Sequence, residues 1–116
     1  MRFLLTYTAK ENLPPTPEKM AAIQKLVEDN TKAGILLDTG GMLPLSKGAR
    51  VKQDNGKFTA TDGPFPETKE LVIGYAIVQV RSREEAVEQA RRFMAIAGDG
   101  EGEIRQLEGP GDGHRH

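Results

Sequence analysis

The run LVIGYAIVQV, residues 71–80, constrains the fold of this chain more than any other feature. It is rich in β-branched residues, which favour a strand, and it is about half as long as a membrane-spanning helix. Alternate side chains of a strand point to opposite faces of its sheet. Both faces of this strand are apolar, one carrying Leu71, Ile73, Tyr75 and Ile77 and the other Val72, Gly74, Ala76, Val78 and Val80. The sheet therefore needs cover on both sides.

Capping signals predict a helix on each side of this strand in the sequence. Thr16 before Pro17 and Glu18 is typical of a helix start, and Gly34 of a helix end. This first helix, over residues 17–33, has one face that we expect to be buried, formed by Met20, Ile23, Leu26 and Val27. In the second helix Ser82 and Glu85 form a capping box, Gly98 closes the helix, and Ala86, Ala90, Phe93 and Ala97 share one face.

The remaining segments predict short strands. MRFLLTYTA at residues 1–9 alternates like a strand, and GILLDTGGMLPL is interpreted as a strand that bends at Gly40-Gly41 and stops at Pro44. ARVKQDNGKFTA is a hairpin about the Asn55-Gly56 dipeptide that type I′ turns prefer. GDGEGE is interpreted as a flexible acidic loop and EIRQLE as a final strand.

This order of elements predicts an α+β sandwich in which two helices cover one face of a sheet. Residues 1–108 form a single domain, and residues 109–116 are a polar, glycine-rich, flexible tail. Two helices cannot cover both faces of the strand at 71–80, so a second copy packed sheet against sheet is the expected cover. The alternative is that the hairpin at residues 48–60 folds back over the sheet.

Composition excludes several kinds of site. The chain has no cysteine, and its two histidines, His114 and His116, lie in the tail, so we expect no metal, no cofactor and no histidine-based catalysis in the body. Net charge is −1, and acidic or neutral residues interrupt the basic residues of the hairpin, so we expect no nucleic-acid partner. No segment is apolar and long enough for a membrane. A soluble cytoplasmic protein is expected.

The segment TDGPFPETKE, residues 61–70, is the strongest candidate for a site. Pro64 and Pro66 stiffen it, and charged residues follow immediately before the apolar strand. A stiff backbone that holds charges at the rim of an apolar space can form a small-ligand site. The candidate ligand-binding residues are Asp62, Phe65, Glu67, Lys69, Glu70 and Tyr75. The alternative is a structural loop with solvated charges and a core tyrosine.

DGPFPETKE, followed by GYAIVQV and SREEAVEQA, resembles the signature of the YCII-related family, specifically its DGPF branch. MRFLLTY, GILLDTGGMLP and EIRQLE are also similar to that family. The resemblance implies a ferredoxin-like fold that pairs into a dimeric α/β barrel. The related YCII branch carries a His–Asp pair proposed as an acid–base site, and this sequence departs from that pattern, because residues 1–113 contain no histidine.

Two functions remain open. One is a dimeric small-molecule-binding domain whose pocket is bordered by the DGPFPETKE loop. The other is a cofactor-independent lyase or isomerase with its pocket between helices and sheet, in which Asp62 or Glu70 takes a proton while Lys69 stabilises the oxyanion. The lack of histidine and of nucleotide motifs favours binding.

Overall fold

The computed structural model describes residues 1–11, 14–43, 45–62 and 73–109. Its main sheet contains β1 (Arg2–Ala9), β2 (Leu36–Met42), β5 (Ile73–Gln79), β6 (Gly100–Glu101) and β7 (Ile104–Leu107). The strand order is β2-β5-β1, and β6 and β7 both pair with the other side of β1. All of these pairs are antiparallel.

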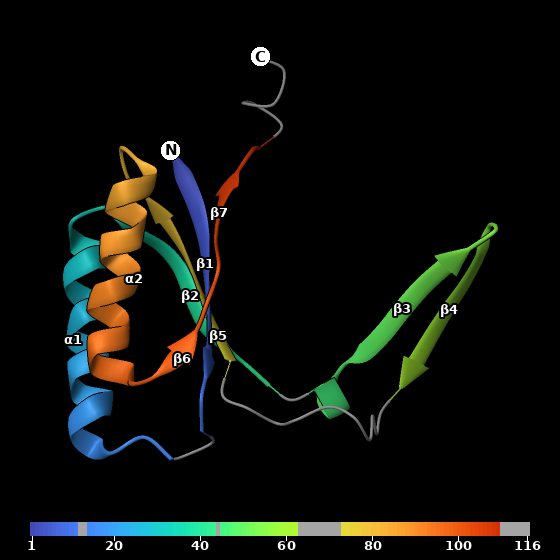
Figure 1. Cartoon of the computed structure of the whole chain (residues 1–116), viewed down its shortest axis with the longest axis horizontal. Helices are drawn as coiled ribbons and strands as arrows, with labels where there is room; N and C mark the ends of the chain where they lie inside the picture. The colour runs from blue at the N-terminus through green and yellow to red at the C-terminus, as the bar shows by residue number, and fades with distance from the viewer. Residues whose placement is uncertain (12–13, 44, 63–72, 110–116) are drawn as a thin grey trace.

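Two helices, α1 (Pro17–Lys32) and α2 (Arg83–Ala97), lie together on one face of this sheet (Figure 1). The predicted α+β class with two helices on one face of an antiparallel sheet is therefore confirmed, and the arrangement is ferredoxin-like. Each helix begins at the predicted cap. Thr16 Oγ1 accepts the Lys19 N–H at 3.1 Å, and Ser82 Oγ accepts the Glu85 N–H at 3.1 Å.

The second half of the capping box differs from the prediction. The Glu85 carboxylate accepts a hydrogen bond from the Arg81 N–H at 2.9 Å, one residue before the cap. It still satisfies a backbone N–H beside the start of α2, although a complete box would pair it with the N–H of Ser82. The helix ends at Gly98, whose φ of 108° lies in the region that favours glycine.

The strand β1 lies inside the sheet and alternates as its sequence predicts. Phe3, Leu5 and Tyr7 are buried on the side of the helices. The register places Phe3 opposite Val78 and Leu5 opposite Ala76, so the same face of β5 also points to the helices. The other face, here called the outer face, carries Leu4, Thr6, Thr8, Ile73, Tyr75 and Ile77.

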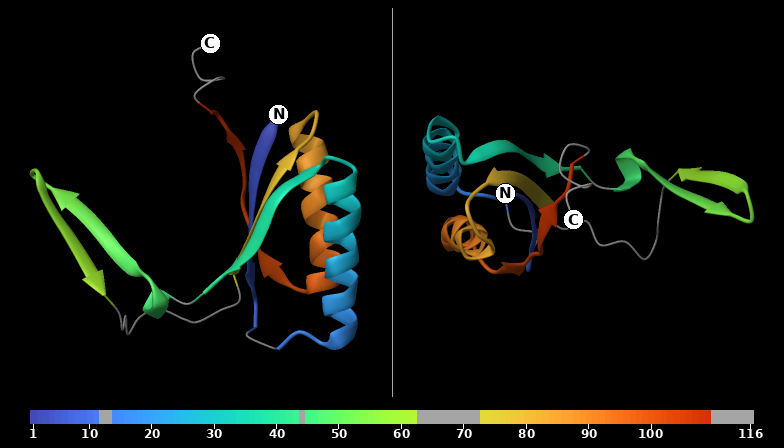
Figure 2. Two further views of the ribbon diagram at one scale, coloured as in Figure 1. Left: turned by 180° about the vertical axis from the view of Figure 1, so that it is seen from behind. Right: turned by 90° about the horizontal axis from the view of Figure 1, so that it is seen from above.

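The hairpin of β3 (Ala49–Asp54) and β4 (Lys57–Asp62), here called the arm, stands apart from the sheet. It follows a short 3-10 helix, η1 (Leu45–Lys47), and every residue of both strands is exposed. The two turn residues, Asn55 and Gly56, have positive φ as a type I′ turn requires. Figures 1 and 2 show the arm extending away from the helices and the sheet, so it does not fold back over the outer face.

The segment interpreted as a flexible acidic loop is ordered against β1. Strand β6 pairs Gly100 with Ala9 and Glu101 with Thr8. A Cβ at Gly100 would clash with the Thr8 carbonyl oxygen, and one at Gly102 with the Thr6 carbonyl oxygen. Gly100 and Gly102 therefore allow the backbone of this segment to lie close to that of β1, whereas composition alone suggested a flexible loop.

Within the described part of the chain, no helix combines the length and the apolar character needed to cross a membrane.

Candidate functional site

The space between the helices and the sheet is packed at one end and hollow at the other. At the packed end, five residues form the buried core: Phe3, Leu5, Val78, Val80 and Ala86. At the hollow end, α1, α2 and the sheet border a cavity of about 630 Å³ that is partly open to solvent. That volume lies within the range of about 300–1,000 Å³ that is typical of small-molecule sites.

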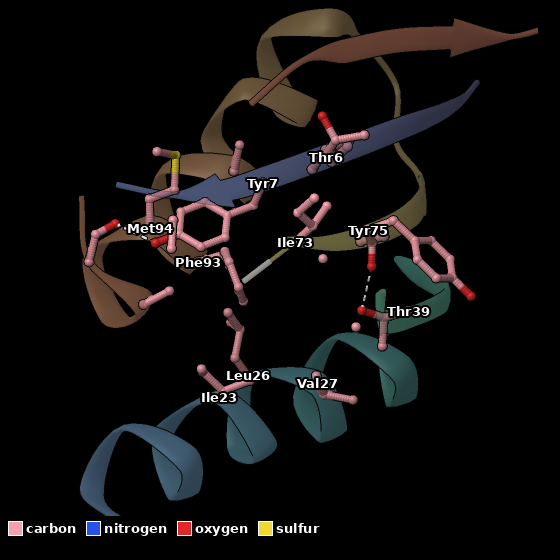
Figure 3. A pocket seen from close by; sticks show the side chains of 18 of the residues that line it. Thr6, Tyr7, Ile23, Leu26, Val27, Thr39, Ile73, Tyr75, Phe93 and Met94 are labelled. Carbon is pink, nitrogen blue, oxygen red and sulfur yellow. Dashed lines mark hydrogen bonds between the residues drawn. The ribbon is translucent and has the colours of Figure 1, made fainter. Parts of the chain in front are cut away.

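The walls of the cavity are largely apolar. The first helix contributes Ile23, Leu26 and Val27, and α2 contributes Phe93 and Met94 (Figure 3). All five remain partly exposed. The stripe of α1 was predicted to be a buried face, and the structure corrects this, because the stripe borders the cavity and only Asn30 of α1 is buried. Met20, placed on the same stripe, is 57% exposed.

Part of the sheet wall is made of small residues, which leaves space beside them. Opposite the helices, β5 presents Gly74 and Ala76, and β2 presents Thr39 and Gly41. At the packed end the corresponding positions on the sheet hold Val78 and Phe3. Tyr7 of β1 packs against Phe93 of α2, but the small residues of β5 and β2 give the apolar stripe of α1 little to pack against.

Tyr7 is the buried aromatic residue at the hollow end. Its hydroxyl donates to the carbonyl oxygens of Gly98 and Asp99, at 3.1 and 3.2 Å, and its ring meets Phe93 edge to face with centroids 5.2 Å apart. Burial, and then the negative charge of Asp99, raise the pKa of the Tyr7 hydroxyl above its ordinary value of 10.0. Tyr7 is therefore a neutral donor held in place, with its oxygen still able to accept a hydrogen bond.

A pair of amides joins the two helices at the cavity wall. Asn30 Nδ2 donates to Gln89 Oε1 at 2.9 Å, and both residues line the cavity. Asn30 is buried, at 9% exposure. Each amide retains donors and an acceptor beyond this bond, so the pair can hydrogen-bond an uncharged polar group. Asn30 and Gln89 were not identified from the sequence as site residues. The signal that could have identified them is a polar residue on the apolar stripe of each helix.

Charged residues gather at the end of the cavity where α1 begins and α2 ends. They are Lys10, Glu11, Lys19 and Asp99. Lys19 Nζ reaches across to the end of α2, 3.5 Å from where a Cβ of Gly98 would lie. Two cations and two carboxylates leave this end of the cavity without a net charge.

Tyr75 lies on the outer face of the sheet. Its ring crosses β2 over Gly40, where a Cβ would meet Tyr75 Cε1 at 3.1 Å, and its hydroxyl donates to Asp38 Oδ2 at 3.0 Å. In Figure 3 the ring points away from the labelled cavity side chains, and the Tyr75 carbonyl accepts from Thr39 Oγ1 at 2.8 Å. The hydrogen bond to Asp38, and then desolvation, raise the pKa of the Tyr75 hydroxyl. Tyr75 borders the cavity mainly as part of its sheet wall.

Of the other five predicted site residues, only Asp62 lies in the described part of the chain. Asp62 is the exposed last residue of β4, opposite Ala49, and is not among the residues that line the cavity. Phe65, Glu67, Lys69 and Glu70 lie outside the described residues. Among the residues that are described, no group of three or more histidine, cysteine or acidic side chains could hold a metal ion.

The family model of the YCII-related domain matches residues 1–108 of this chain. The chain belongs to the YCII-related family. Nearly all of the described structure, including the arm and both cavity helices, lies inside the matched range. This YCII-related domain is also 32% identical, over 101 residues, to an uncharacterised protein of Rhizobium meliloti (strain 1021). The match covers 85% of this chain and 78% of that relative.

Proposed function

We propose that this YCII-related domain binds a small, uncharged, largely apolar molecule in the cavity between α1, α2 and the sheet. The observation that carries the proposal is the hollow itself. An apolar space of about 630 Å³ is left open beside a packed core in the same two layers. A domain of this size gains stability by filling such a space, so an open one favours a ligand.

The polar groups of the cavity favour an uncharged ligand. Asn30 and Gln89 are neutral amides, and Tyr7 is a neutral phenol. The Lys10 and Lys19 cations share their end of the cavity with Glu11 and Asp99. A ligand with a carbonyl or hydroxyl group could bond to the neutral groups without the desolvation cost of a charge.

We also propose that the domain works as a homodimer with the outer faces of two sheets packed together. Leu4, Ile73 and Ile77 make this face apolar, and neither helix covers it. A face of this kind on a soluble chain favours a partner surface. The DGPFPETKE loop, placed by sequence between β4 and β5, is proposed to border the cavity. The lack of cysteine agrees with a cytoplasmic setting.

The test is a thermal-shift series with matched compounds, in which neutral lactones and phenols are compared with carboxylates of the same carbon skeleton. A ligand that binds the folded state raises the unfolding midpoint by mass action. We expect neutral compounds to raise it and their carboxylate counterparts to have a smaller effect. Equal shifts for both members of each pair would contradict the uncharged class.

A blocking variant ties the shift to the cavity. Gly74→Val adds a side chain to the sheet wall, where a Cβ makes only ordinary contact with the Gly40 carbonyl at 3.5 Å. We expect it to retain or raise stability and to abolish the ligand shift. Thr8→Val, which places valine on the outer face of the same sheet, is the matched control and keeps the shift. Ligand shifts that survive in Gly74→Val would place binding elsewhere.

The lyase or isomerase alternative stays a hypothesis. Of the three groups assigned to its acid–base chemistry, only Asp62 belongs to the described residues, and it does not line the cavity. The binding proposal needs only the cavity.

A further inference from the structure

Exposed apolar side chains are concentrated in one part of the chain. Eight large hydrophobic residues of the described structure are strongly exposed, and five of them lie between residues 37 and 58. Leu37, Met42 and Leu43, at 51, 46 and 77%, lie in and just after the edge strand β2, and we call them the β2 margin. Val51 and Phe58, each 63% exposed, lie on the arm.

The arm has one apolar and one polar face. In an antiparallel pair, residues directly opposite each other share a face. The register puts the pairs Ala49 with Asp62, Val51 with Ala60 and Gln53 with Phe58 on one face, where four of the six side chains are apolar. The alternate pairs, Arg50 with Thr61, Lys52 with Thr59 and Asp54 with Lys57, make the other face polar. Such a pattern is expected of a sheet that lies against another surface.

No described part of the same chain covers the apolar face of the arm. Every residue of β3 and β4 is exposed, and the arm extends away from the body (Figure 2). The radius of gyration is 16.6 Å, compared with about 13 Å for a compact domain of this length. An isolated two-stranded hairpin is marginally stable in water, so this arm is expected to gain its stability from a partner.

We propose that the arm is a clasp for a second copy of this chain: its apolar face docks on the partner's β2 margin, and the partner's arm docks in return. This inference rests on the proposed dimer and goes beyond it by assigning the arm a binding surface. A twofold axis makes both contacts at once, because each copy supplies one arm and one margin. A different protein bound to the arm would leave the margin bare.

The size of the interface also favours a second copy. The outer face of the sheet covers roughly 400 Å², estimated from strand spacing and rise. That is about half of the roughly 800 Å² per partner that a standard stable interface buries. On the same scale the arm adds roughly 200 Å², and the β2 margin, which belongs to an edge strand of that sheet, adds little beyond the sheet area. Sheet contact and clasp together therefore come to roughly 600 Å² per partner, at the lower end of the range for stable interfaces.

The first experiment measures the dimer dissociation constant by light scattering and sedimentation over a concentration series. Val51→Ser combined with Phe58→Ser removes the apolar face of the arm. The matched control, Lys52→Ser combined with Lys57→Ser, changes the polar face of the same hairpin. We expect the first variant to weaken the dimer at least tenfold and the control to stay within about twofold. Circular dichroism checks that both variants keep the folded body.

The second experiment uses the absence of cysteine in the natural sequence. A chain carrying Phe58→Cys is mixed with a mass-tagged chain carrying Met42→Cys, and a short bismaleimide is added. We expect a cross-link between the two different chains. Lys52→Cys in place of Phe58→Cys is the control and should cross-link much less, because it lies on the opposite face of the arm.

The outcomes separate the two proposals. A wild-type dimer that the apolar-face variant weakens, with the cross-link between chains, supports the clasp. A wild-type dimer whose dissociation constant is unchanged by that variant overturns the clasp and leaves the dimer standing. A monomer at micromolar concentration overturns both. A cross-link within a single chain that carries both Phe58→Cys and Met42→Cys, and none between chains, shows that the arm folds onto its own margin and also overturns the clasp.

Discussion

The two ends of the space between the helices and the sheet are formed by the same elements, but one end is packed with side chains and the other holds a cavity. At one end Ala86 of α2 is fully buried against Phe3 and Val78. At the other end Ala97, on the same face of α2 about three turns later, borders the cavity. The helices continue their apolar stripes through both ends, and the difference comes from the sheet, where β5 changes from Val78 to Gly74.

This contrast shows that an amphipathic pattern on a helix does not guarantee a packed core. Packing needs complementary volume on both sides, and at the hollow end β5 and β2 supply little of it. The two ends should therefore differ in energy as well as in geometry.

The largest difference is expected for truncation of a phenylalanine at each end. Phe3 is 2% exposed in the core, so Phe3→Ala should cost about 3–5 kcal/mol of unfolding free energy. Phe93 borders an existing cavity, so Phe93→Ala should cost less than about 2 kcal/mol, mainly from its ring contact with Tyr7. Urea unfolding of both variants measures the difference. Equal losses would mean that the hollow end is packed in solution.

Enlarging an alanine at each end gives the converse test. Ala86 is fully buried, so Ala86→Leu should overpack the core and cost about 1–3 kcal/mol. Ala97→Leu adds the same atoms beside the cavity and should change stability by less than about 0.5 kcal/mol, or increase it. Thermal unfolding of the pair decides this. A strong loss in Ala97→Leu would contradict an open cavity.

The amide pair between the helices should contribute a smaller amount. Gln89→Leu removes the acceptor of the Asn30 side-chain amide, which is buried, so a loss of about 1–2 kcal/mol is expected. Replacing both residues by leucine should recover part of that loss, since neither side then leaves an unpaired polar group. A double-mutant cycle on unfolding free energies measures the coupling. A coupling energy near zero would show that the bond is not formed in solution.

The smallest effect is expected for the Tyr7 hydroxyl, at about 1 kcal/mol in Tyr7→Phe. Because the pKa of Tyr7 is raised in the folded state, its contribution is complete below its ordinary pKa of 10.0 and is lost as the pH rises through the folded-state pKa. The pKa of Tyr75 is also raised, so Tyr75 contributes to the same alkaline fall in stability. Tyr7 and Tyr7→Phe are therefore compared in a Tyr75→Phe background. Tyr7→Phe should flatten the alkaline fall in stability. An unchanged alkaline profile would mean that the hydroxyl is solvated.

Much of the local structure could be predicted from residue patterns. The caps at Thr16 and Ser82 located both helix starts, the Asn55-Gly56 turn located the arm, and alternation in residues 1–9 identified the buried face of β1. These signals depend on neighbouring residues only, so they survive in any tertiary arrangement. The acidic loop at residues 98–103 was misread, because its glycines permit a close approach to β1 that composition does not reveal.

The candidate site was harder to predict. The loop motif directed attention to Asp62 and to residues beyond the described structure, whereas the described cavity is lined by Tyr7, Asn30 and Gln89. These three come from β1, α1 and α2, and no local pattern places them together. A polar residue on an apolar stripe was the one available signal.

By itself, then, the order of residues determined which segments became helices and strands, where they begin, and that one strand is apolar on both faces. Only the tertiary structure decided that the inner layer is filled at one end and hollow at the other, and that the arm extends away from the sheet. Periodicity sets the direction of a side chain within its own element. Whether that side chain is packed depends on the volumes of side chains from distant parts of the chain, and only the tertiary structure brings these together.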